Sequence, residues 1–154
     1  MKRVIHALIF VLALVPLMLL MRWGGEAKAP WSASRDGVSA RLVAPRFLWK
    51  ADEPVSIFVR FRNASDEPRA LPSSAHLVLR IHHEGALVVE EMRDVALGVE
   101  GDPLIPPHGE RDVRVRAEPL NLEGSGLYAL DASVADFSLP AVKIRLVRTR
   151  NAAP

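Results

Sequence analysis

The chain has 154 residues, with 20 Lys and Arg residues against 18 Asp and Glu residues and a formal net charge of +2. Lys2, Arg3 and Arg22 flank an N-terminal apolar run, and removing these three from the 20 leaves 17 basic against 18 acidic residues, a net charge close to −1. That balance offers no basic field for nucleic acid. The chain has no cysteine, which excludes disulfides, zinc–thiolate sites, iron–sulfur clusters, thiol nucleophiles and a lipid anchor on an acylated cysteine.

Residues 4–21 form an apolar run that only one His and one Pro interrupt. The run is longer than the roughly 7–15 residues of a signal-peptide core and approaches the roughly 20 residues of a membrane span. Residues 1–23 are therefore predicted to form a transmembrane signal-anchor that contacts the lipid bilayer through residues 4–21. The positive charges at residues 2–3 place the N-terminus in the cytoplasm, and Arg22 and Trp23 then lie at the outer membrane interface.

A cleaved secretory signal is the alternative interpretation of this segment. Residues 27–29 read Ala-Lys-Ala, which has the small–x–small form of a cleavage site. Pro30 follows directly and makes a poor substrate, and Arg22 after the run also favours retention. In both interpretations the body of the chain is exported. The predicted location is the bacterial inner membrane, in a single pass, with the body in the periplasm.

Residues 24–37 are predicted to be a linker between the anchor and the body. Small residues, Pro and Gly dominate this stretch, and it shows no hydrophobic period. Trp31 is unusual in a linker. It either folds onto the body as a lid or inserts into the membrane surface or a partner.

From residue 38 onward apolar residues recur at every second position, which is typical of half-buried antiparallel strands. The clearest strand is 55–62, in which Val55, Ile57, Val59 and Phe61 alternate with Ser56, Phe58, Arg60 and Arg62. In another predicted strand, Val113, Val115 and Ala117 alternate with Asp112, Arg114 and Arg116. Further strands are predicted at 38–42, 77–82, 87–91, 95–99, 128–134 and 142–146, with a tight hairpin at Glu84 and Gly85.

Turn clusters separate these strands, and no amphipathic helix is evident. The pattern predicts an all-β sandwich or barrel over residues 38–148, followed by a tail at 149–154.

Three segments of the body resemble bacterial immunoglobulin-like domains. They are ADEPVSIFVRFRNASDEP, which resembles the turn, second strand and Asn-Ser turn; IPPHGERDVRVRAEPL, which resembles the turn before a later strand; and GSGLYALDASV, which resembles the Gly-x-Tyr strand. The pattern is similar to the intracellular proteinase inhibitor (BsuPI-like) type and to the sandwich domains appended to cytochrome-oxidase assembly proteins.

The resemblance covers about residues 38–147 and implies an immunoglobulin-like antiparallel β-sandwich, preceded here by one N-terminal transmembrane helix. Its motifs are turns and core positions, so they imply a fold and not an activity. Inhibition is not carried over, because this chain is predicted to be exported and its loops contain no protease-binding signature.

The titratable residues form no pattern typical of a reaction centre. His82 and His83 point to opposite faces of one strand, and His76 lies on the face of His82 but about 20 Å away. Glu90 and Glu91 also face opposite ways. The sequence contains no Gly-x-Ser-x-Gly motif. We therefore expect no catalytic, cofactor-binding or metal site, and a protein that is not an enzyme.

The remaining candidates lie on the surface. Phe58 is on the polar face of its strand, where either a loop covers it or it forms an exposed contact with Arg60 and Arg62. An apolar, Pro-rich stretch at 103–107 either caps the fold or docks on a partner. The predicted interface residues are Phe58, Arg60, Arg62, Trp31, Leu104 and Ile105.

These features favour a non-enzymatic accessory or structural subunit, anchored in the membrane, that binds and stabilises a larger inner-membrane complex. That complex would be respiratory, photosynthetic or part of an export machinery. A periplasmic inhibitor or ligand-binding module of immunoglobulin-like fold is the alternative, and it predicts a protruding loop or a concave pocket. An enzyme or metal carrier would instead show clustered titratable residues.

Overall fold

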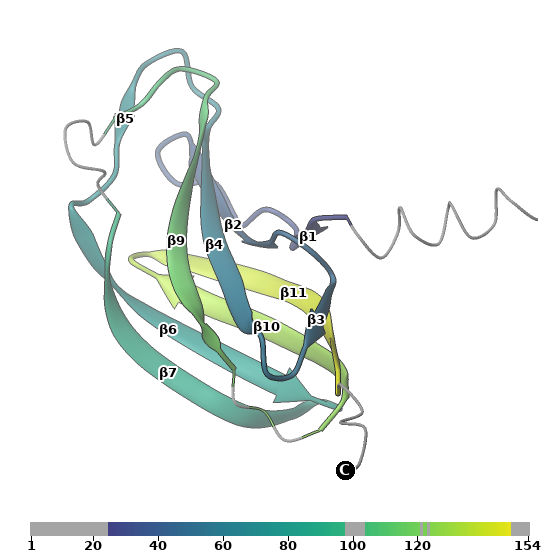
Figure 1. Cartoon of the computed structure of the whole chain (residues 1–154). Coiled ribbons are helices and arrows are strands. Elements are labelled where there is room, and N and C mark those ends of the chain that lie inside the picture. The colour runs from purple at the N-terminus through teal and green to yellow at the C-terminus, as the bar shows by residue number, and fades with distance from the viewer. Residues whose placement is uncertain (1–24, 98–103, 121, 123, 149–154) are drawn as a thin grey trace, which may run out of the picture.

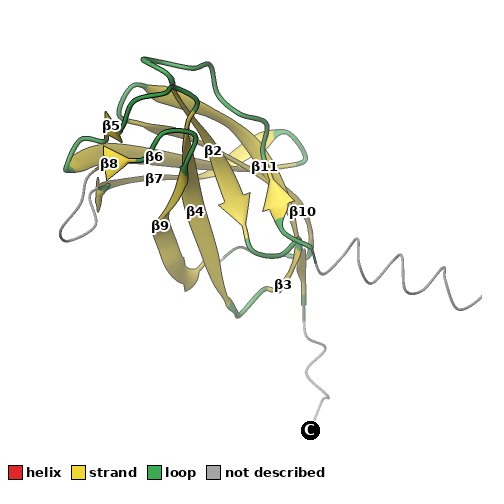
Figure 2. Ribbon diagram, turned by 90° about the horizontal axis from the view of Figure 1, so that it is seen from above, coloured by secondary structure: helices red, strands yellow, loops and turns green. Residues whose placement is uncertain are grey.

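The computed structural model describes residues 25–97, 104–120, 122 and 124–148. The predicted anchor, with Arg22 and Trp23, and the predicted tail lie outside these residues. Every regular element of the described part is a strand, which confirms the all-β class (Figure 2). Within the same ranges, no helix has the length and apolar character that crossing a membrane requires.

Two main sheets contain most of the strands (Figure 1). Sheet A has the order β1 (Ala27–Lys28), β2 (Val38–Ala44), β4 (Pro54–Asn63), β9 (Glu110–Pro119). Sheet B has the order β3 (Leu48–Lys50), β11 (Phe137–Val147), β10 (Gly126–Val134), β6 (Ser74–His83), β7 (Ala86–Ala96). The short strands β5 (Arg69–Ala70) and β8 (Leu104–Ile105) pair with each other. All pairs between these strands are antiparallel except β3 with β11.

The two main sheets pack face to face on one apolar core. In β4, Val55 is 1% exposed and Ile57, Val59 and Phe61 are 0% exposed, so the predicted alternation is confirmed. Residues of both sheets belong to the same buried cluster, and in Figure 1 β4 and β9 of sheet A cross in front of β10 and β11 of sheet B. Burial of this apolar surface is the main source of stability in such a domain.

The two strands predicted at 87–91 and 95–99 form one continuous strand as far as they are described, β7. Glu84 and Gly85 both have positive φ angles, 52° and 85°. They form the predicted two-residue hairpin between β6 and β7, because such angles match the twist of the flanking strands.

At one edge of the fold the chain passes from sheet A to sheet B. β2 ends at Ala44 in sheet A, and β3 begins at Leu48 beside β11 in sheet B. Trp49 is buried there, and its indole N–H donates a hydrogen bond to the carbonyl oxygen of Arg46 over 2.8 Å. The crossing therefore joins the two sheets along this edge.

Residues 27–37, which we call the edge segment, run beside β2. β1 pairs with the end of β2. The main-chain N–H groups of Ala29, Ser32 and Arg35 then donate to the carbonyl oxygens of Leu42, Ala40 and Val38, over 3.0, 2.8 and 2.7 Å. Most of the stretch expected to be a linker is thus hydrogen-bonded to sheet A. Only residues 24–26 separate the predicted anchor from the sheet.

The opposite edge, between β7 and β9, is closed by charged groups. β9 has a bulge, so that Ile57 pairs with Arg116 while Phe58 pairs with Arg114. The extra residue turns Arg116 toward the core. Simple alternation, which placed Arg116 opposite Val115 and Ala117, is therefore wrong at this position. Arg116 is 5% exposed.

Arg116 pairs with Glu91 of β7, on the other sheet. Arg93 of β7 contacts Glu91 over 3.0 Å and also Glu118 of β9 over 3.4 Å. These four residues form an ion-pair network that spans the gap between the two sheets. We call it the intersheet network.

Removing one charge of the intersheet network is expected to lower the free energy of unfolding more than removing the central pair, Glu91 and Arg116, together. Arg116→Met leaves Glu91 at the edge of the core with Arg93, and should lower the free energy of unfolding by about 2–3 kcal/mol. The double variant Glu91→Leu/Arg116→Met should recover most of that loss, because neither charge remains. Urea denaturation followed by circular dichroism measures both values.

The control for this comparison is Arg145→Met, at an exposed position of β11, which should change stability by no more than about 0.5 kcal/mol. The account would be contradicted if the two substitutions were additive. In that case the double variant would lose as much stability as Arg116→Met and Glu91→Leu lose together when each is measured alone.

Candidate functional site

The outer face of sheet A contains four of the predicted interface residues. We call it the arginine face, and its members are Arg41 on β2, Phe58, Arg60 and Arg62 on β4, Arg114 on β9, and Trp31 of the edge segment. The strand register sets Arg41 opposite Arg60, and Phe58 opposite Arg114. Alternation in β4 therefore brings Phe58, Arg60 and Arg62 together on one face, as predicted.

Arg60 is already paired within the chain. Its Nε and Nη2 atoms donate to the carboxylate of Asp112 over 2.6 and 2.7 Å, and Nη2 also donates to Glu26 over 3.0 Å. The hydrogen bonds with Asp112, helped by the charges of Glu26 and Glu110, raise the pKa of Arg60 above its ordinary value. Its side chain is 17% exposed. Arg60 thus connects the start of the edge segment to β9 and offers a partner little free charge.

Trp31 lies against two other arginines of the face. The guanidinium carbons of Arg41 and Arg62 are 4.1 and 4.4 Å from the centroid of its ring. The geometry matches the first of the two interpretations of Trp31, a residue folded onto the body. The Nε atoms of Arg41 and Arg62 are buried and have no hydrogen-bond partner among the described residues.

Phe58 is half-buried, so neither of the two predictions for it holds in its simple form. The guanidinium carbon of Arg114 lies 5.4 Å from the centroid of its ring. Val43, opposite Phe58 on β2, is only 1% exposed. Phe58 is therefore the centre of a small apolar area on the outer face, with part of its ring open to a partner.

The predicted pair Leu104 and Ile105 is divided by the fold. Ile105 is 0% exposed and belongs to the core, whereas Leu104 is 42% exposed. The side-chain amide of Asn63 donates to the carbonyl oxygens of Ile105 and Pro106 over 3.1 and 3.2 Å, which fixes this stretch of chain. Only Leu104 is placed to contact a partner.

Sequence reasoning missed a second surface, on β7. Leu87, Val88 and Met92 are 52%, 47% and 80% exposed, and we call these three residues the β7 surface. β7 is the edge strand of sheet B. The signal in the sequence was the run of apolar residues 86–89, which breaks the alternation of a strand with one buried face.

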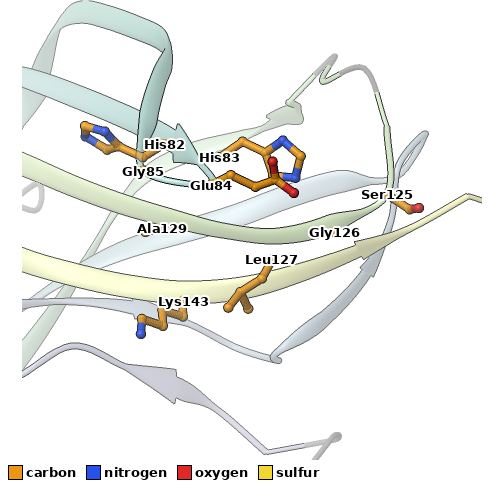
Figure 3. A pocket seen from close by; sticks show the side chains of 9 residues that line it. All are labelled: His82, His83, Glu84, Gly85, Ser125, Gly126, Leu127, Ala129 and Lys143. Carbon is orange, nitrogen blue, oxygen red and sulfur yellow. The ribbon is translucent and has the colours of Figure 1, made fainter.

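A hollow of about 390 Å³ lies at the β6–β7 hairpin. His83, Glu84, Leu127 and Lys143 line it together with His82, and in Figure 3 the two histidines point in different directions. The ring of His83 stacks on Tyr128 at 4.4 Å between centroids. His82 places Nε2 2.8 Å from the carboxylate of Asp131. In the described part of the chain, no group of three or more His, Asp or Glu is placed to hold a metal ion.

Comparisons with known proteins place the chain in no family. No family model matches it, and no curated protein matches it. Among solved structures it is similar to a β-glucosidase of Erythrobacter marinus, with 18% identity and a TM-score of 0.44 over 71% of this chain and 15% of that one. It is also similar to the alkylpurine DNA glycosylase AlkC of Pseudomonas fluorescens bound to DNA containing an abasic site analogue. There the identity is 8% and the TM-score 0.46, over 75% of this chain and 32% of the glycosylase. These scores are too low to support an argument about function.

If Trp31 and Arg62 are in contact, the effects of substituting them on the free energy of unfolding should not be additive. In a double-mutant cycle of Trp31→Ala and Arg62→Gln, we expect a coupling of about 0.5–1 kcal/mol in the free energy of unfolding, as for a partly exposed cation–π pair. A second cycle pairs Trp31→Ala with Lys143→Gln on sheet B and should show a coupling within about 0.3 kcal/mol of zero. Equal couplings in the two cycles would mean that Trp31 does not rest on Arg62 in solution.

Proposed function

We propose that the chain is a non-enzymatic accessory subunit, anchored in the bacterial inner membrane, whose periplasmic domain binds and stabilises a larger membrane protein complex. That complex is respiratory, photosynthetic or part of an export machinery. The observation that carries the proposal is the β7 surface, where an edge strand keeps three large apolar side chains exposed. Apolar side chains gathered on an edge strand favour association with another chain.

The charged residues of β7 strengthen this argument. Edge strands are commonly protected from association by charges. Here Glu90 pairs with Arg80 over 3.0 Å, and Asp94 pairs with His76, both across the β6–β7 pair. Arg80 compensates the charge of Glu90, Asp94 contacts the imidazole of His76, and Met92 lies exposed between the two acidic residues. A partner strand can therefore pair with the free edge of β7 and cover Met92 without desolvating unpaired carboxylates.

The finer architecture that we propose is an immunoglobulin-like sandwich. Sheet A corresponds to strands A, B and E of that fold as β2, β4 and β9, and sheet B to C′, C, F and G as β7, β6, β10 and β11. Tyr128 is buried near the start of β10, the equivalent of strand F. A Cβ on Gly124, four residues earlier, would lie 3.8 Å from its hydroxyl oxygen. This placement is similar to the tyrosine corner of such domains.

The membrane anchor supports the same function. Residues 1–23 are proposed to cross the membrane once, with the N-terminus in the cytoplasm. A tether of this kind raises the effective concentration of the domain near a membrane partner, so that even a small interface suffices. The hollow at the β6–β7 hairpin favours the second candidate, a periplasmic inhibitor or ligand-binding module.

Co-purification tests the proposal. The full chain, isolated from native membranes in mild detergent, should carry integral membrane proteins at a fixed ratio, identified by mass spectrometry. The variant Val88→Lys/Met92→Lys should lower their recovery about tenfold or more, as for residues at the centre of an interface. Both positions are exposed, so its thermal unfolding should stay close to that of the unchanged chain.

The matched control is Ser138→Lys/Ala141→Lys, which adds the same charges at exposed positions of β11 in the same sheet. It should leave partner recovery unchanged. Equal losses in the two variants, or a chain that carries no protein partner, would contradict the proposed function. A small molecule retained without any protein would favour the ligand-binding alternative.

A further inference from the structure

We propose that the arginine face lies on the headgroups of anionic phospholipids, with the guanidinium groups of Arg41, Arg62 and Arg114 contacting lipid phosphates. The inference rests on the proposed function in one respect, the N-terminal membrane anchor. It adds a second, electrostatic contact between the domain and the bilayer.

The first argument is the length of chain between the anchor and the sheet. The predicted outer interface residue is Trp23, and the first residue paired with sheet A is Ala27. Four residue steps span at most roughly 14 Å, at about 3.3–3.6 Å each. The edge of sheet A is therefore held within about that distance of the headgroups. The interaction of exposed charges with the surface decays over about 8 Å at physiological salt. Because about 14 Å is the fully extended limit, a less extended chain brings the face within that range.

The second argument is the state of the three arginines. Arg60 is compensated by Asp112 and Glu26, whereas the buried Nε atoms of Arg41 and Arg62 have no acceptor within the described part of the chain. Each of the three lies over an aromatic ring, Trp31 or Phe58. Contact with a ring restricts the motion of a guanidinium, and each of the three side chains stays at least partly exposed, so it keeps N–H groups for a ligand. The N–H edge of a guanidinium matches the oxygens of a phosphate.

The third argument concerns the aromatic residues themselves. Trp31 and Phe58 are both half-buried on the same face as these arginines. An indole is favoured at a membrane interface, because one part of it is apolar and its N–H is polar. A sheet face with cations in contact with aromatic rings therefore fits an extended anionic surface. An acidic protein surface is the rival occupant, and the experiment distinguishes the two.

The absence of cysteine from the sequence allows a single reporter to be introduced. Ser56→Cys places a nitroxide label on the outer face of β4 beside Phe58, and Met92→Cys places one on the β7 surface. The full chain is reconstituted in phosphatidylcholine vesicles with and without phosphatidylglycerol, and no other protein is present. Electron paramagnetic resonance then measures how far each label is shielded from a relaxing agent in the water.

We expect the label at residue 56 to be shielded only when phosphatidylglycerol is present, and the label at residue 92 to stay accessible in both. Arg41→Gln/Arg62→Gln should lower the ratio of shielded to accessible label roughly tenfold or more. Lys143→Gln/Arg145→Gln removes the same charge from exposed positions of β11 and should leave the ratio unchanged. Arg41→Lys/Arg62→Lys keeps the charge without the planar fork and should retain part of the shielding.

Equal shielding in the two kinds of vesicle would overturn the proposal, because the tether alone would then press the domain onto the bilayer. Shielding that appears only in native membranes, and not with phosphatidylglycerol, would identify an acidic protein as the occupant and also overturn it. The proposed function fails differently. In that case no partner co-purifies with the chain, while shielding by phosphatidylglycerol persists.

Discussion

The main-chain hydrogen bonds between the edge segment and β2 decide where several other groups of the molecule lie. They place Trp31 over Arg41 and Arg62, and they bring Glu26 to Arg60. They also cover the edge of sheet A, which would otherwise present unpaired N–H and C=O groups to other chains. Finally, they leave only residues 24–26 between the predicted anchor and the first residue paired with sheet A. In the proposed arrangement, this pairing limits how far the domain can lie from the membrane.

The two edges of the fold are closed in different ways, and this difference gives the two sheets different surfaces. At the first edge the chain passes from β2 to β3, and the buried Trp49 belongs to the common core. At the second edge the bulge in β9 turns Arg116 inward to Glu91. A buried ion pair adds little net stability compared with apolar residues, but it penalises arrangements in which the charges do not meet. The intersheet network therefore favours one packing arrangement of β7 against β9 across the gap between the sheets.

This closure joins β7 to β9 through side chains alone, so the main chain of β7 on the side away from β6 has no strand partner among the described residues, and its outward side chains are exposed. The arginine face and the β7 surface belong to different sheets, so the two proposed contacts, with lipid and with protein, do not compete for the same surface. In the proposed arrangement, the arginine face orients the domain on the bilayer. The β7 surface then meets a membrane partner from a fixed direction, which reduces the orientational freedom lost on binding.

Much of the fold could be predicted from the sequence, because side chains with period two report which strand faces are buried. Val55 to Arg62 and the Glu84-Gly85 hairpin are examples. The edge segment could not be predicted, because it pairs through main-chain groups and has no hydrophobic period. Arg116 was misplaced because one bulge residue inverts the alternation after it.

The candidate surfaces were harder to predict than the strands. Alternation placed Phe58, Arg60 and Arg62 on one face, but it carried no information that Asp112 and Glu26 would compensate Arg60. Alternation also could not predict that Ile105 is buried while Leu104 is exposed. The burial of Ile105 depends on contacts with Asn63, which is distant in the sequence, and with the core. The β7 surface was missed because whether a strand lies at an edge depends on the topology and not on its own residues.

Amide hydrogen exchange in the edge segment tests the central claim most directly. It is measured by nuclear magnetic resonance on the full chain in a membrane mimetic. If the segment is paired with β2, the amides of Ala29, Ser32 and Arg35 exchange much more slowly than in an unfolded chain, with protection similar to that of the amides that join β2 and β4. Exchange of these three amides at the rates of an unfolded chain, with β2 and β4 still protected, would contradict the account, because residues 24–37 would then be a free linker.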